Sequence, residues 1–239
     1  MRVIENFLFT SESVCEGHPD KICDQVSDAI LDACLEQDPE SRVACETSAK
    51  TGYIMVFGEL STTANINIPI IVRNVIKDIG YDSSEKCFDY KTCAVLVAIE
   101  TQSMEIANAV EHAQHIERNG HVNASSADVG AGDQGIMFGY ATDESEQLMP
   151  LTAVFAHAIT QYLSECRRSK KIPWLRPDGK SQVTIEYKHD VSLNGQSPEP
   201  GEGALVPLRV HTIVVSVQTD PGILIDEIRR VIRSEVIEK

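Results

Sequence analysis

The chain has 239 residues, of which 42% are hydrophobic and 24% charged, so it reads as a globular protein with room for two domains. Its formal net charge of −15 disfavours a nucleic-acid partner, which needs a basic surface, and no apolar run approaches the length of a membrane span. The seven cysteines form no CxxC pair, which favours reduced thiols and a cytoplasmic location.

Hydrophobic periodicity predicts alternating helices and strands in the first half. Pro19 opens a helix that stops near Asp38-Pro39, and strands follow over 42–50 and 53–60 with Thr51-Gly52 as their turn. A second helix runs from Pro69 to Gly80, and a third strand covers 92–99.

The second half repeats this order. A helix is predicted from Pro150 to about Arg167, strands over 182–188 and 208–218, and an amphipathic helix over 222–238. The shared pattern suggests an internal duplication. Because the second half ends on its last helix, without the strand that follows in the first half, we expect the chain to be cut from a larger architecture.

Two segments look like connections, and one glycine-rich loop stands beside the first of them. Residues 190–204 are rich in Gly, Pro and Ser, which favours a disordered loop without a functional role. Residues 105–128 are as consistent with a mobile lid as with a plain linker. The loop Gly130–Gly135 has the spacing of a dinucleotide fingerprint, but turn-like residues precede it and extended ones follow it. It can approach a ligand closely without being a nicotinamide site.

The residues at the start of the first helix allow two readings. Asp20 lies in the first turn beside His18 and Lys21, where backbone N–H groups and the helix dipole attract anions. A carboxylate that holds a metal, a histidine and a lysine would make a phosphate site. An ordinary capped helix entry explains the same residues equally well.

Further charged residues have comparable alternatives. The run 174–181 ends like a P-loop, but Trp174 stands where the required glycine would be, which leaves a turn presenting Asp178 and Lys180. Glu46 and Glu59 lie on adjacent predicted strands, either in a site or on an exposed face with a cationic partner.

Taken together, these stretches resemble S-adenosylmethionine synthetase (methionine adenosyltransferase). The GHPDK and GAGDQG strings, in this order, carry most of the resemblance, which covers nearly the whole chain. The matching runs are 9–14, 16–25, 49–52, 58–59, 89–93, 130–140 and 173–184.

The resemblance implies a reaction and a set of roles. The family joins ATP to L-methionine, releasing phosphate and pyrophosphate, with Mg2+ and K+ as cofactors. By matching position, His18 and Lys180 would be catalytic, Asp20 would hold magnesium and Glu46 would belong to a potassium site. Glu59 and Gln102 would contact methionine. ATP would be bound by Glu12, His18, Lys21, Asp133, Asp178 and Lys180.

The implied fold is α+β, built from repeated sheet-plus-helix units with the family's third unit missing. The expected parts are an N-terminal repeat over 1–102, a mobile gate over 103–130 and a central repeat over 131–239. The family shares active sites between subunits, so a homodimer or dimer of dimers is expected, and the 239-residue chain alone is expected to be inactive. The alternative is a non-catalytic nucleotide- or partner-binding protein on the same scaffold.

Overall fold

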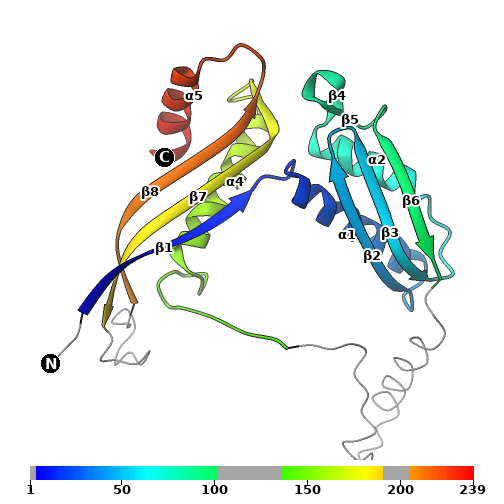
Figure 1. The fold of residues 1–239 in the computed structure, drawn as a ribbon, viewed down its shortest axis with the longest axis horizontal. Coiled ribbons are helices and arrows are strands. Elements are labelled where there is room, and N and C mark those ends of the chain that lie inside the picture. The colour runs from blue at the N-terminus through cyan, green and yellow to red at the C-terminus, as the bar shows by residue number, and fades with distance from the viewer. Residues whose placement is uncertain (1–3, 102–135, 191–204) are drawn as a thin grey trace, which may run out of the picture.

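The computed structural model describes residues 4–101, 136–190 and 205–239. They form two layered units, each with a three-stranded sheet and with helices against one face of that sheet (Figure 1). Helices and strands are mixed in both units, so the predicted α+β class is confirmed. Among the described residues, no helix is long and apolar enough to cross a bilayer.

The first unit has a sheet of order β2-β3-β6, in which β2 and β3 are antiparallel and β3 and β6 parallel. Its helices begin and end where the sequence predicts, since Pro19 opens α1 and Gly80 closes α2 with a φ of 108°. A short excursion made of β4, a 3-10 turn and β5 was not predicted. In chain order the elements are α1 (Pro19–Gln37), β2 (Arg42–Lys50), β3 (Tyr53–Ser61), α2 (Ile68–Ile79), β4 (Asp82–Ser83), the 3-10 turn Ser84–Lys86, β5 (Phe88–Asp89) and β6 (Ala94–Glu100).

The second unit has an antiparallel sheet of order β1-β7-β8, covered on one face by α4 and the C-terminal helix. Strand β7 is much longer than the predicted 182–188 and already includes Asp178 and Lys180. A π-helical turn extends α5. The elements are β1 (Ile4–Val14), α4 (Leu151–Arg168), β7 (Leu175–Asp190), β8 (Leu205–Thr219), α5 (Ile225–Ile232) and the π turn Arg233–Ile237.

Strand β1 is the main element that the sequence analysis missed. It pairs antiparallel with β7, so the second sheet has three strands although the second half of the chain contributes only two of them. Its inward positions include Ser11 and Ser13, which hides the usual alternation of apolar and polar residues. The Ser11 hydroxyl lies 2.7 Å from that of Thr152, and the Ser13 hydroxyl lies 2.9 Å from that of Thr160, so α4 satisfies these hydroxyls.

Each unit has its own apolar core. In the first, Val26 and Ile30 of α1 and Val72 and Ile76 of α2 are fully buried against β3. In the second, the core lies between α4 and the inward residues of β7. Within the described part of the chain, the opposite faces of both sheets are exposed, for example at Phe57 and Val214. Because the two cores are separate, the contacts where the units meet determine how the units are positioned relative to each other.

Candidate functional site

The N-terminus of α1 is formed by His18 and Pro19. His18 is the N-cap residue, in extended conformation, and its Nδ1 accepts a hydrogen bond of 3.2 Å from the Asp20 backbone N–H. The neutral ring therefore carries its proton on Nε2, which is free to donate. The capped helix entry is thus present, and it leaves the carboxylate of Asp20 81% exposed beside the helix N-terminus.

Strand β7 brings Asp178 close to His18 at the junction of the two units, where the segment between β1 and α1 meets the start of β7, and Lys180 follows two residues later on the same strand. Asp178 is half-buried, and desolvation raises the pKa of its carboxyl, while the nearby His18 and the Gly179 N–H act in the opposite direction. The Lys180 ammonium forms an ion pair of 2.6 Å with Glu12 on the neighbouring strand β1. Cross-strand pairing places these two side chains together although they are far apart in sequence.

A close backbone contact joins the N-terminus of α1 to the start of β7. The segment between β1 and α1 crosses from one unit to the other directly over the start of β7, and the Gly17 N–H donates to the carbonyl of Pro177 at 3.2 Å. A Cβ on Gly17 would lie 2.4 Å from the Cβ of Pro177, so only glycine fits there. The sequence GHPDK thus places the histidine directly after the residue that contacts Pro177.

Two lysines at this junction, Lys21 and Lys180, are already paired with carboxylates. Lys21 lies 2.5 Å from Asp24, whose hydrogen bond is the main cause of the raised pKa of the lysine. Lys180 is paired with Glu12. A polyphosphate bound here would have to compete with these carboxylates or gain further positive charge from elsewhere.

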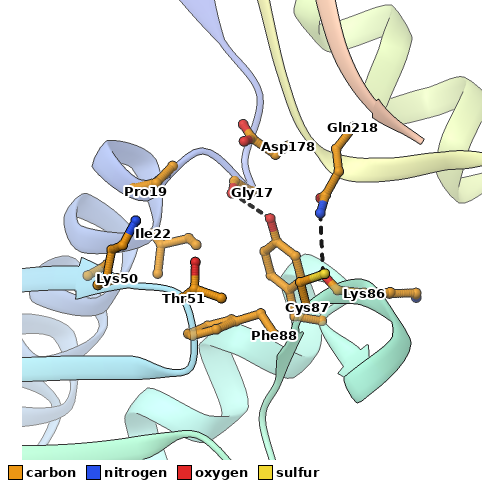
Figure 2. A pocket seen from close by; sticks show the side chains of 12 residues that line it. Gly17, Pro19, Ile22, Lys50, Thr51, Lys86, Cys87, Phe88, Asp178 and Gln218 are labelled. Carbon is orange, nitrogen blue, oxygen red and sulfur yellow. Dashed lines mark hydrogen bonds between the residues drawn. The ribbon is translucent and has the colours of Figure 1, made fainter. Parts of the chain in front are cut away.

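A cavity of about 120 Å³ opens beside the junction and is lined by residues of both units (Figure 2). Gly17, Pro19 and Asp178 form one side, and Tyr81 donates a hydrogen bond of 2.8 Å across it to the Gly17 carbonyl. Burial raises the pKa of the Tyr81 phenol, so it stays protonated as a donor. The amide oxygen of Gln218, which also lines the cavity, is buried and has no partner among the described residues.

Glu46 and Glu59 lie elsewhere. They belong to β2 and β3, where they are exposed on the sheet face opposite to the helices. Glu46 is opposite Phe57 in the register, and Glu59 is opposite Glu100 of β6. Within this chain, the structure therefore does not bring them together with His18 and Lys180.

Two predicted site residues, Gln102 and Asp133, lie outside the described residues, as do the predicted gate over 103–130 and the loop Gly130–Gly135. Among the residues that are described, no group of three or more His, Cys, Asp or Glu side chains is arranged to hold a metal ion. Asp20 fits magnesium only as a single oxygen ligand, a role that suits a metal that also binds substrate phosphates and water.

Sequence reasoning missed several residues of the junction. Tyr81 follows the glycine that ends α2, and nothing in the local pattern marks it as a contact to Gly17. Glu16 stands within a motif already noted, next to Gly17, and pairs with Arg167 and Arg168. The adjacent arginines at the end of a predicted helix were the one available signal for this contact.

Two protein-family models match the chain. Residues 6–104 match the family described as S-adenosylmethionine synthetase, N-terminal domain, and residues 128–239 match S-adenosylmethionine synthetase, central domain. The first match includes β1, which lies in the same sheet as the β7 of the second. Because the two matches cover most of the sequence, the chain belongs to the S-adenosylmethionine synthetase family.

Proposed function

We propose that the protein takes part in the synthesis of S-adenosylmethionine from ATP and L-methionine. The methionine sulfur attacks C5′ of ATP and triphosphate leaves, to be hydrolysed to phosphate and pyrophosphate. A neutral thioether must be held in line with the bond that breaks, and charge gathers on the leaving oxygen. The site therefore has to orient two substrates and neutralise a polyphosphate.

The observation that carries this proposal is the junction of Gly17 with Pro177. It holds the N-terminus of α1 next to the residues of β7 that would contact the nucleotide. His18 would donate its Nε2 proton toward the oxygen that leaves C5′. Lys180 would exchange Glu12 for a phosphate, and Asp178 would contact the nucleoside part of ATP.

Further ATP contacts are assigned to Glu12, Lys21 and, outside the described residues, Asp133. Asp20 would hold Mg2+ together with phosphate oxygens, and its exposure at the helix N-terminus supports this role. When bound, the metal supplies positive charge that neutralises the phosphates. Glu46 would provide one oxygen to a K+ site.

Methionine would be bound by Glu59 and by Gln102, across a subunit boundary. The open face of the first sheet supports such a boundary, because it combines Glu59 with exposed apolar residues, among them Phe57 (38% exposed) and Leu96 (52%). A homodimer, or a dimer of dimers, would cover this face and bring Glu59 to the partner's nucleotide. We place the protein in the cytoplasm, where its seven cysteines, all free, would stay reduced.

We further propose that these 239 residues alone release no S-adenosylmethionine. The reason is electrostatic, since both Lys21 and Lys180 already have carboxylate partners at the junction. Additional cationic side chains would be required to neutralise the charge that gathers on the departing triphosphate.

The test uses the coding sequence expressed to its natural stop codon, with ATP, methionine, Mg2+ and K+, and product detected by mass spectrometry. We expect product from the wild type and its loss in His18→Asn and in Lys180→Met. Unchanged rates in both variants would refute the assigned roles. Product formed by the 239-residue chain alone would refute the proposed need for further cationic side chains.

A further inference from the structure

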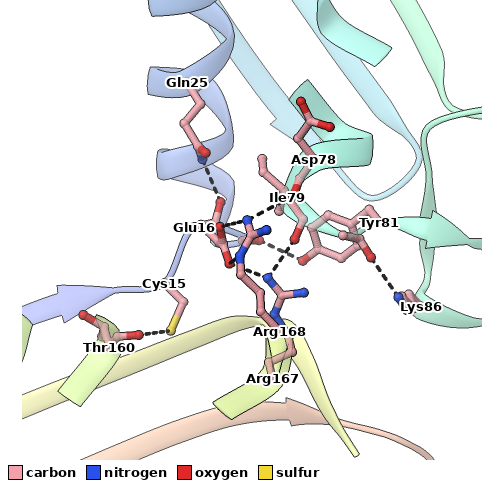
Figure 3. Close-up of polar contacts among 12 residues, drawn as sticks. Cys15, Glu16, Gln25, Asp78, Ile79, Tyr81, Lys86, Thr160, Arg167 and Arg168 are labelled. Carbon is pink, nitrogen blue, oxygen red and sulfur yellow. Dashed lines mark hydrogen bonds and ion pairs between the residues drawn. The ribbon is translucent and has the colours of Figure 1, made fainter. Parts of the chain in front are cut away.

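Glu16 stands at the centre of the polar contacts between the two units (Figure 3). Its carboxylate is bound by Arg167 and Arg168, the last residues of α4, with Arg168 Nε at 3.0 Å from Oε1. The Glu16 side chain is 21% exposed and that of Arg167 only 12%, so the pair is largely shielded from water. The side chain of Arg168 is 53% exposed, but it holds the carboxylate through two nitrogens, and such bidentate contacts fix the geometry of a pair more strictly than a single surface contact.

The same arginines also contact the first unit. Arg167 Nη2 donates to the carbonyl of Ile79 at 2.9 Å, and Arg168 Nη2 donates to that of Asp78 at 3.0 Å. These carbonyls belong to the last turn of α2, whose negative dipole end attracts cations. A Cβ on Gly80 would lie 2.5 Å from Arg167 Nη1, so the guanidinium is packed against the backbone. One pair of arginines thus joins the end of α4, the end of α2 and the segment 15–18 between β1 and α1, which we call the crossover.

The position of Glu16 in the chain gives this network a consequence for the site. His18 follows it by two residues and belongs to the first unit, whereas Asp178 and Lys180 belong to the second. The backbone at Glu16 is itself held, since the Gln25 amide donates to its carbonyl at 2.9 Å. The Glu16 carboxylate therefore links the start of α1 to the end of α4.

We propose that Glu16, held by Arg167 and Arg168, is a positioning residue that sets His18 against Asp178 and Lys180. It does not touch the nucleotide and acts only through the placement of His18. This inference rests on the proposed function in so far as His18 binds nucleotide, but its geometric part concerns the crossover alone.

The experiment compares Glu16→Gln, His18→Asn and the double variant in the 239-residue chain, with Mg-ATP affinity measured by titration calorimetry. The matched control is Glu186→Gln, because Glu186 is 22% exposed and also paired with an arginine, Arg209, at 2.7 Å on the same sheet. We expect Glu16→Gln to weaken binding about tenfold, the loss of one charge-assisted hydrogen bond. Glu186→Gln should leave the affinity unchanged.

The double variant separates positioning from general support. If Glu16 acts through His18, removing the carboxylate costs nothing further once the imidazole is gone, and the double variant binds like His18→Asn. Independent, additive losses would overturn the proposal, as would unchanged affinity in Glu16→Gln.

A second measurement is independent of nucleotide binding. Amide hydrogen exchange should become faster in Glu16→Gln at Cys15 and Gly17, whose N–H groups donate to Gly179 and Pro177, and stay unchanged in the core of β7. If the wild-type 239-residue chain binds no Mg-ATP, exchange alone decides the inference, and the proposed function is decided by the product assay on the full coding sequence. Unaltered exchange at both amides would refute the proposed role of Glu16, and faster exchange confined to the crossover would support it.

Discussion

Replacing Gly17 with alanine tests the contact on which the candidate site depends. The added Cβ would lie 2.4 Å from the Cβ of Pro177, 2.5 Å from its carbonyl carbon and 2.6 Å from its oxygen. Two of these atoms are backbone, so no change of side-chain rotamer relieves the clash. The crossover has to lift away from β7, which breaks the hydrogen bond from the Gly17 N–H to Pro177.

We expect Gly17→Ala to lower the free energy of unfolding by about 1–3 kcal/mol, the usual effect of overpacking, with loss of that hydrogen bond at the upper end. Urea denaturation followed by circular dichroism measures the change, and calorimetry reports the accompanying loss of Mg-ATP binding. The matched control is Gly139→Ala, because a Cβ at Gly139 meets nothing within 4 Å. Its unfolding free energy should stay within about 0.5 kcal/mol of wild type. Equal stability and equal nucleotide affinity of both variants would refute the reasoning.

Three further predictions concern burial. Asp178→Asn should stabilise the ligand-free protein at pH 7: burial raises the carboxyl pKa in the folded state, so the native state binds more protons than the unfolded one and wild-type stability falls as pH rises above about 4. The urea midpoints of wild type and Asp178→Asn should converge in acid. A difference between the midpoints that grows in acid would contradict a raised pKa of Asp178. Ile30→Ala should lower the unfolding free energy by about 2–5 kcal/mol, because Ile30 is fully buried, whereas Leu31→Ala, at a position 37% exposed, should have a clearly smaller effect. Among the thiols, exposed Cys87 should react first with a disulfide reagent at pH 8. Cys15, whose pKa burial raises to about 11, should not react. A fast reaction phase that remains in Cys87→Ser would contradict this order of reactivity.

The helices were predictable because their signals are local. Pro19 and Gly80 mark ends that depend only on backbone geometry, and the buried positions of α1 recur at helical spacing. Strand β1 could not be found in this way, since Ser11 and Ser13 face the interior and their partners are hydroxyls on a helix far along the chain. Patterns of hydrophobicity do not reveal a buried polar contact.

The candidate site, like the fold, was predictable only where the signal is local in the sequence. Resemblance of motifs singled out His18 and Lys180, and the register of β1 against β7, which places Lys180 opposite Val14, makes Glu12 its diagonal neighbour. The role of Glu16 depends on Arg167 and on carbonyls at the end of α2, which only the assembled fold brings together. Glu46 and Glu59 lie on an open sheet face, so a single chain does not place them against the other site residues.

The partner of the first strand also bears on how the protein is made. Thr10 meets Thr184 across a separation of 174 residues, so an early part of the nascent polypeptide has no pairing partner until that further stretch has been translated. At ribosomal rates of about 5–20 residues per second, that interval lasts roughly 9–35 seconds. During it, the unpaired strand is exposed to other nascent chains and to chaperones. A separately expressed first half would keep that liability permanently, which argues for producing both halves as one polypeptide.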